Sequence, residues 1–171
     1  LLVTRQLQPA RHLLVYTRRT EPIALRLRHL ISQHSDLSQD LLCQPYDFEA
    51  LVIALRSRLD APVRTIINLT GGTKLMSLGA YALAVETGCQ VVYYENEGRR
   101  LLTYTLENGA PRLASDQKLL TLINIDDYLR AHWPGYRQEG PARDDQNNLN
   151  QGGLFEEAVF SALIPRCEEV L

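Results

Sequence analysis

Cysteine is scarce in this sequence, and its spacing is irregular. The chain of 171 residues has only Cys43, Cys89 and Cys167, which are odd in number and far apart. A disulfide framework needs pairs of cysteines, and a structural zinc site needs closely spaced ones. The sequence offers neither pattern, so we expect these residues to be thiols buried in a core.

Net charge and long apolar runs are also lacking. The formal net charge of -2 argues against a broad electrostatic grip on nucleic acid, which depends on many Lys and Arg contacts to phosphate. Any phosphate site must therefore be local. No stretch approaches the roughly 18 apolar residues of a membrane span, and no secretory leader is found, so we expect a cytoplasmic protein.

Both ends of the sequence suggest a fragment of a longer protein. The chain opens without Met on Leu1-Leu2-Val3 and stops at Val170-Leu171, where a new strand could begin. The segment 1–7 has the pattern of a helix end, and we expect the strand that precedes this helix to lie upstream of Leu1.

Apolar runs and amphipathic segments alternate along the first 134 residues. Runs rich in β-branched residues predict strands, and apolar residues at helical spacing predict helices between them. The predicted strands are 12–17, 41–43, 65–70, 90–94 and 100–105, and the predicted helices begin at Glu21, Phe48, Thr73 and Ile125. This alternation predicts the α/β class, with a Rossmann-like, mostly parallel sheet and helices on both faces.

Composition changes after residue 134. The segment 135–152 is predicted to be a linker because it is polar and rich in turn formers. A new amphipathic helix is predicted from Gly153, so 153–171 would begin a second domain that is not completed. Trp133 and Tyr136 lie where the first domain, 1–134, meets the linker, and they would either anchor this junction or stack on adenine.

The segment Asn68-Leu69-Thr70-Gly71-Gly72-Thr73-Lys74 connects a predicted strand to a predicted helix. Ligands of open α/β sheets bind at the carboxyl ends of the strands, which is where this turn lies. Two glycines can adopt positive φ and allow close approach to the backbone, and the amides of a first helical turn are unpaired donors for an anion. We therefore predict that the turn binds the phosphates of a nucleotide.

Lys74 supports this prediction because a cation in the first turn opposes the helix dipole by about 0.3–1 kcal/mol unless an anion is bound. Thr70 and Thr73 add hydroxyls that can cap the helix or donate to phosphate. The alternative is a tight connection with a threonine cap and a solvated lysine. The spacing matches neither G-x-x-x-x-G-K-[ST] nor G-x-G-x-x-G, which disfavours ATP hydrolysis and NAD binding.

The helix that follows the turn, from Leu75 to Val85, is apolar almost all round. We expect the sheet to cover one side of it and something else to cover the other. A partner subunit and a neighbouring element of the same chain both remain open, because periodicity does not identify the neighbour.

The run from Ile66 to Ser77 resembles the signature turn of CARF domains, the CRISPR-associated Rossmann-fold sensors of type III ancillary nucleases. The segment Gly153-Leu154-Phe155-Glu156-Glu157-Ala158-Val159 is similar to the first helix of the restriction-endonuclease-like domain that follows CARF in those proteins. The resemblance implies a homodimer that binds a cyclic oligoadenylate, most often cyclic tetra-adenylate, across its two-fold axis. Binding would allosterically switch on a nuclease for DNA or RNA that depends on a divalent metal, Mn or Mg.

The resemblance also implies roles for particular residues. Thr70, Gly71, Gly72, Thr73 and Lys74 would contact the ligand, and Asn68 would position the loop. Glu156 would help to hold the metal and would be the one catalytic candidate in this chain, since the rest of the nuclease core is expected after Leu171. A carboxylate near the start of a helix also favours the helix dipole, which is the structural alternative for Glu156.

Tyr93 and Tyr94 end a predicted strand at the edge where ligands bind. Tyr94 is a candidate contact to adenine, and a half-buried strand end is the alternative. Two other functions also remain open. A ring nuclease would cleave the cyclic ligand itself while Lys74 and the threonines steady the phosphate, and a binding module would take a different nucleotide second messenger.

Overall fold

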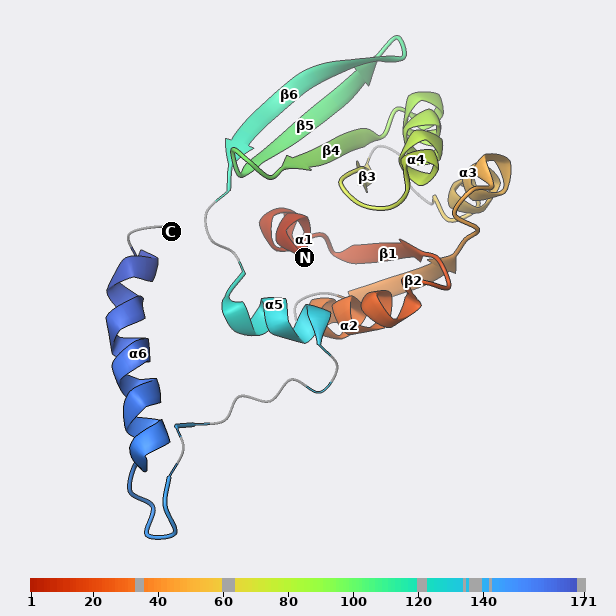
Figure 1. The fold of residues 1–171 in the computed structure, drawn as a ribbon. Helices are drawn as coiled ribbons and strands as arrows, with labels where there is room; N and C mark the ends of the chain where they lie inside the picture. Colours follow the sequence, from red (N-terminus) through yellow and green to blue (C-terminus); the bar gives the residue numbers. More distant parts are fainter. Residues whose placement is uncertain are drawn as a thin grey trace. The chain divides into compact units, whose positions relative to one another are not determined.

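The computed structural model describes residues 1–32, 36–59, 64–119, 123–133, 135, 140–141 and 143–168, with only the backbone described for 36–38, 160 and 162–168. The chain divides into two compact units, Leu1–Pro134 and Gly135–Leu171. Figure 1 shows the ribbon of both. The elements are α1 (Leu2–Leu7), β1 (Arg11–Tyr16), α2 (Glu21–Ser32), β2 (Asp36–Leu42), α3 (Phe48–Arg56), β3 (Ile66–Asn68), α4 (Lys74–Thr87), β4 (Gln90–Glu95), β5 (Arg100–Glu107), β6 (Ala110–Lys118), α5 (Ile125–His132) and α6 (Gln151–Glu168).

The parallel strands confirm the predicted α/β class. β1 pairs with β2 in parallel around α2, and β3 pairs with β4 in parallel around α4. In the described residues β1 pairs only with β2, and β3 only with β4, so each of these strands leaves one edge open.

The second sheet continues from β4 into an antiparallel hairpin, β5 and β6. β5 corresponds to the predicted strand 100–105, but β6 was not predicted. Every residue of β6 is exposed, so its sequence lacks the apolar alternation that identifies a half-buried strand. The turn before it does carry a signal, since Asn108 and Gly109 both have positive φ (53° and 78°), as a two-residue hairpin requires.

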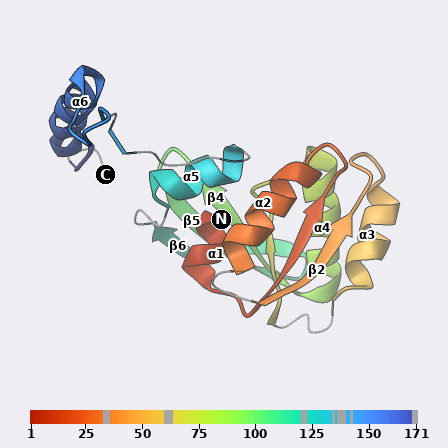
Figure 2. The same ribbon diagram turned by 90° about the horizontal axis from the view of Figure 1, so that it is seen from below.

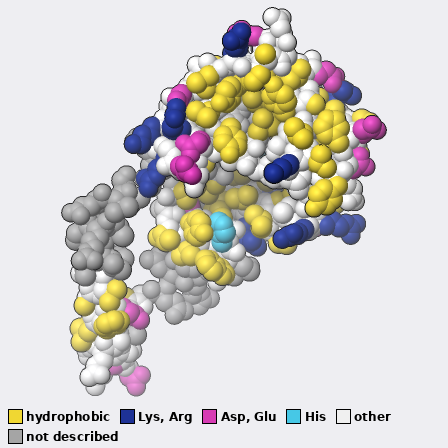
Figure 3. Space-filling view, turned by 45° about the horizontal axis from the view of Figure 1, so that its top comes forward, with side chains coloured by type: hydrophobic (Ala, Val, Ile, Leu, Met, Phe, Trp, Pro, Cys, Tyr) yellow, Lys and Arg dark blue, Asp and Glu magenta, His cyan; other side chains and the backbone are white. Residues whose placement is uncertain are grey.

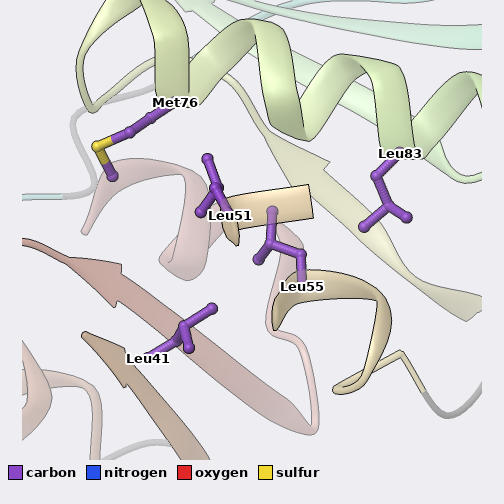
Figure 4. Packing of buried hydrophobic residues seen from close by; sticks show 5 residues of the cluster. All are labelled: Leu41, Leu51, Leu55, Met76 and Leu83. Atoms are coloured by element: carbon purple, nitrogen blue, oxygen red, sulfur yellow. The ribbon is translucent and has the colours of Figure 1, made fainter. Parts of the chain in front are cut away.

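Helices α3 and α4 pack over the β1–β2 sheet. Figure 4 shows their buried contacts, in which Leu51 and Leu55 of α3 meet Met76 and Leu83 of α4 above Leu41 of β2. α3 begins at Phe48 as predicted, and Asp47 caps it because its side chain accepts a hydrogen bond from the Ala50 amide. This packing fixes α4 relative to the strands and therefore fixes the turn at its beginning.

α1 covers the face of the β3–β6 sheet that is opposite to α4. Val3 of α1 is buried against Val92 and Leu101, and in Figure 2 α1 and α2 lie in front of the strands with α4 behind them. Arg5 of α1 forms a bidentate ion pair with Asp127 of α5. Helices on both faces of the strands are the doubly wound arrangement that the sequence predicts.

The second unit begins differently from the prediction. The predicted linker contains a compact turn, in which the Asp144 carboxylate accepts from the amides of Gln146 and Asn148. Helix α6 begins at Gln151, within the segment predicted as linker, because Asn150 caps it through the Gly153 amide. Val170 and Leu171, the predicted start of a strand, lie outside the described residues, and so does Tyr136. No helix in the described ranges is long and apolar enough to cross a membrane.

Candidate functional site

Two side-chain hydrogen bonds hold the turn after β3, and one of them ties it to β4. The Asn68 carboxamide oxygen accepts from the Thr70 amide at 3.0 Å, and this closes a local turn as soon as the strand ends. The Thr70 hydroxyl oxygen accepts from the Tyr94 amide at 2.8 Å. Both side chains thus hold the turn at the carboxyl edge of the two parallel strands, while the Thr70 hydroxyl keeps its own proton to donate.

The two glycines differ in backbone conformation. Gly72 has a φ of 88°, in the left-handed region that disfavours other residues, whereas Gly71 has no positive φ. A Cβ atom added at Gly71 would meet nothing within 4 Å. Only Gly72 therefore satisfies the sequence expectation of positive φ, and the glycine at 71 is required neither by its own backbone nor by the protein around it.

Ser77 orients the peptide between these glycines. Its hydroxyl donates to the Gly71 carbonyl oxygen at 3.3 Å from the first turn of α4. Because a trans peptide is planar with its C=O and N–H opposed, the Gly72 amide points away from the helix. Sequence reasoning missed this residue, since no spacing rule links a serine to a carbonyl six residues before it.

The backbone amides of the turn and of the start of α4 form a row of hydrogen-bond donors. From Gly71 to Leu75 the backbone amides donate to no acceptor in the described part of the chain, and the first helical hydrogen bond is that of the Ser77 amide to the Thr73 carbonyl. Such amides at a helix start carry the positive end of the dipole and are suited to an anion. The row is the main chemical feature of the turn.

Thr73 caps α4 and cannot also donate from its side chain. Its hydroxyl oxygen accepts from the Met76 amide at 3.2 Å, and the same hydroxyl donates its proton to the Pro45 carbonyl at 2.9 Å. A hydroxyl has one proton, so in this conformation only the Thr73 backbone amide is available to a ligand. The bond to Pro45, in the loop between β2 and α3, is a long-range contact that the sequence did not indicate.

Lys74 is the first residue of α4, and its side chain is exposed. The first turn of α4 has no acidic residue, and in the described ranges no ion pair involves Lys74. The lysine therefore adds to the positive field of the helix start, and no acidic residue of the described ranges forms an ion pair with it.

The two tyrosines at the end of β4 face opposite sides of the sheet. Tyr94 packs partly buried beside the Val3, Val92 and Leu101 cluster under α1. Tyr93 is 47% exposed on the side of the sheet where α4 lies. The structure thus gives Tyr94 the half-buried environment of the structural alternative, while its amide holds Thr70.

Glu156 lies on α6, in the second unit, and is exposed. Among the described residues no group of three or more His, Cys, Asp or Glu side chains could hold a metal ion. The described part of the second unit therefore does not assemble a metal site around Glu156, and no chemical step is derived from it.

The outer side of α4 is apolar and uncovered. Leu75, Leu78 and Val85 are 38%, 56% and 37% exposed, at a spacing that places them on one stripe of the helix. The buried residues Met76 and Leu83 lie on another side of the helix. Figure 3, in which the top of Figure 1 comes forward, shows hydrophobic side chains gathered on the upper part of the molecule, with basic and acidic ones at the margin.

Comparison with known proteins gives both a family and a fold. The Card1 CARF domain model matches residues 3–128. No curated protein matches the sequence. One similar solved structure is Can2 from Sulfobacillus thermosulfidooxidans in complex with cyclic tetra-adenylate, at 23% identity and a TM-score of 0.64, covering 76% of this chain and 36% of that one. Another is protein VC1899 from Vibrio cholerae, at 17% identity and a TM-score of 0.57, covering 71% and 32%.

The structural matches and the family match support different conclusions. Identities of 23% and 17% establish a shared fold and nothing finer, and this chain spans only about a third of the length of either structure. The family match is stronger, because residues 3–128 make up most of the chain and include the turn, α4 and all the described strands. The chain therefore belongs to the CARF family and matches the Card1 CARF domain within it.

Proposed function

We propose that the first unit binds a cyclic oligoadenylate, with cyclic tetra-adenylate as the first candidate, and acts as a sensor of type III CRISPR defence. The observation that carries the proposal is the row of amides from Gly71 to Leu75, which beside Lys74 have no acceptor among the described residues. Membership of the CARF family and the likeness to Can2, which was solved with cyclic tetra-adenylate, support it.

The turn would bind the ligand through a phosphodiester. The amides of Gly71, Gly72 and Thr73 would donate to the phosphate oxygens, and Lys74 would contribute its charge. The Thr70 hydroxyl retains a proton for the same purpose, whereas Asn68 acts by shaping the turn. Tyr94 would contribute through its amide bond to Thr70 and, where its half-buried ring reaches the edge, through contact with adenine.

We propose a homodimer as the binding form. A cyclic ligand with repeated phosphates has rotational symmetry, and an isologous dimer would present one turn to each half of the ring. The stripe formed by Leu75, Leu78 and Val85 supports this arrangement because it begins beside Lys74 and is uncovered. A second copy packing on this stripe would bring the two turns toward one axis.

The second unit would belong to an effector nuclease acting on DNA or RNA, with Glu156 as one ligand of a divalent Mn or Mg ion. The apolar side of α6 supports a further domain, because Leu154 and Phe155 are 55% and 70% exposed and need a cover. The metal would polarise the scissile phosphate, and ligand binding in the sensor would bias the nuclease allosterically.

Titration of the full-length protein with cyclic tri-, tetra- and hexa-adenylate tests the sensor proposal. Lys74→Ala should weaken binding about tenfold or more, because one charged hydrogen bond contributes roughly 1.5–3 kcal/mol. Arg112→Ala is the matched control, since it removes a positive charge from the hairpin end of β6, away from the carboxyl edge of β4. Absence of binding to all three ligands would refute the sensor.

The same samples address the remaining functions. Chromatography of the ligand after incubation reports whether it is cleaved, which would indicate a ring nuclease. Cleavage of DNA and RNA with and without Mn or Mg tests the nuclease. Sedimentation of the wild type against Leu78→Glu tests the dimer, and an unchanged mass for the variant would remove the α4 stripe from the interface.

A further inference from the structure

A hollow of about 380 Å3 lies beside the ends of β1 and β2. The two strands end together, since Tyr16 is paired with Leu42 and the Cys43 amide donates to the Tyr16 carbonyl at 2.8 Å. The lining comes from the loops that leave both strands, and its residues are Arg18, Arg19, Leu42, Cys43, Gln44 and Pro45. Its volume lies in the range of small-ligand pockets, about 300–1,000 Å3.

Two adjacent arginines line the hollow. Arg18 and Arg19 lie in a tight turn fixed by Thr17 and Thr20, where the Thr20 hydroxyl accepts from the Thr17 amide at 3.0 Å. No ion pair or hydrogen bond of either guanidinium occurs within the described residues, whereas Arg56 is paired with Glu86. Adjacent arginines held together without an acid form a site for an anion, because a guanidinium binds phosphate through two parallel hydrogen bonds.

The other residues that line the hollow suit a base. Leu42 is 47% exposed and, with Pro45, gives an apolar surface. Gln44 supplies an amide that can both donate and accept, as recognition of the adenine edge requires. Cys43 also lines the hollow. Burial raises the pKa of its thiol, which keeps the side chain neutral.

The hollow is joined to the phosphate-binding turn. The Pro45 carbonyl, at its rim, accepts the hydrogen bond from the Thr73 hydroxyl at 2.9 Å. The loop after β2 and the turn after β3 thus both leave the carboxyl ends of their strands, and they meet at this contact. A ligand with several phosphates could reach the amide row and the arginines together.

We propose that this hollow holds one nucleotide unit of the cyclic ligand, with its phosphate on Arg18 and Arg19 and its base against Leu42 and Gln44. The inference rests on the proposed function and adds a second phosphate subsite to it. The hollow would take the unit next to the phosphodiester bound by the turn, so one protomer would hold two consecutive phosphates of the ring.

Binding of cyclic tetra-adenylate to the full-length protein carrying Arg18→Ala and Arg19→Ala tests the subsite. The dissociation constant should rise about 10- to 100-fold, the factor that one or two charged hydrogen bonds contribute. Arg112→Ala should leave it unchanged. If the wild type and Lys74→Ala differ but the double variant behaves like Arg112→Ala, the subsite is wrong and the sensor stands. If the wild type binds no cyclic oligoadenylate, both proposals fall.

Alkylation of Cys43 in the wild type is a second measurement that needs no variant. Because Cys43 lines the hollow, saturating cyclic tetra-adenylate should slow its reaction with iodoacetamide at least fivefold, read from the Cys43 peptide by mass spectrometry. An unchanged rate at saturation would overturn the inference even if the arginine variant failed to fold.

Discussion

Alanine at each glycine of the turn separates a folding role from a binding role. Gly72 has a φ of 88°, and a side chain in the left-handed region costs about 1–2 kcal/mol. For a chain of this size, that loss lowers the melting temperature by about 2–8 °C. Gly71 has no positive φ, and a Cβ there would meet no atom within 4 Å. Gly71→Ala should therefore leave stability unchanged or raise it by up to about 1 kcal/mol, through lower entropy of the unfolded chain.

At Gly71 we expect alanine to weaken ligand binding although it does not lower stability. The added methyl would stand in open space next to the amide row. If a phosphate approaches this backbone as proposed, the methyl would obstruct it, and cyclic tetra-adenylate affinity should fall about tenfold or more while the fold is intact. Thermal unfolding and isothermal titration of both variants check this. Wild-type affinity in Gly71→Ala would refute the close approach of a phosphate to this backbone, and a large loss of stability in the same variant would refute the geometry of the turn.

Three further predictions concern the framework of the site. Thr73→Ala should lose about 0.5–2 kcal/mol of stability, because it removes the α4 cap and the bond to Pro45, whereas Thr73→Ser should melt like the wild type. Arg5→Ala should cost about 1.5–3 kcal/mol in urea unfolding, because the Asp127 carboxylate, with 10% of its side chain exposed, would lose its bidentate ion pair while it keeps the hydrogen bond from the Asn124 amide; a loss below about 1 kcal/mol would mean that the pair acts as a surface pair. The pH profile of Cys43 alkylation should have its midpoint above that of a free cysteine, because burial raises the thiol pKa and the thiolate is the reactive form; a midpoint below it would contradict the burial.

Much of the fold was predictable because its signals are local. The start of α3 at Phe48 and the apolar runs of the parallel strands depend on residues close in sequence and were predicted, although β2 begins five residues earlier than the predicted strand 41–43. β6 was missed because its residues are exposed on all sides and carry no apolar period. The start of α6 was predicted two residues late because glycines usually interrupt a helix, whereas Asn150 caps this one ahead of them.

The sequence by itself determined the place of the site. A strand, two glycines, a threonine cap and Lys74 are consecutive, so their local conformations bring the amide row to the carboxyl edge of a sheet whatever surrounds it. The tertiary structure alone decided what each group can do there. In the tertiary structure the Thr73 hydroxyl donates to the Pro45 carbonyl, and the Tyr94 side chain packs under α1. The hollow lined by Arg18 and Arg19 also has Pro45 in its lining, next to the turn. These contacts join segments that are far apart in the sequence, and only packing of the helices and sheets brings such segments together.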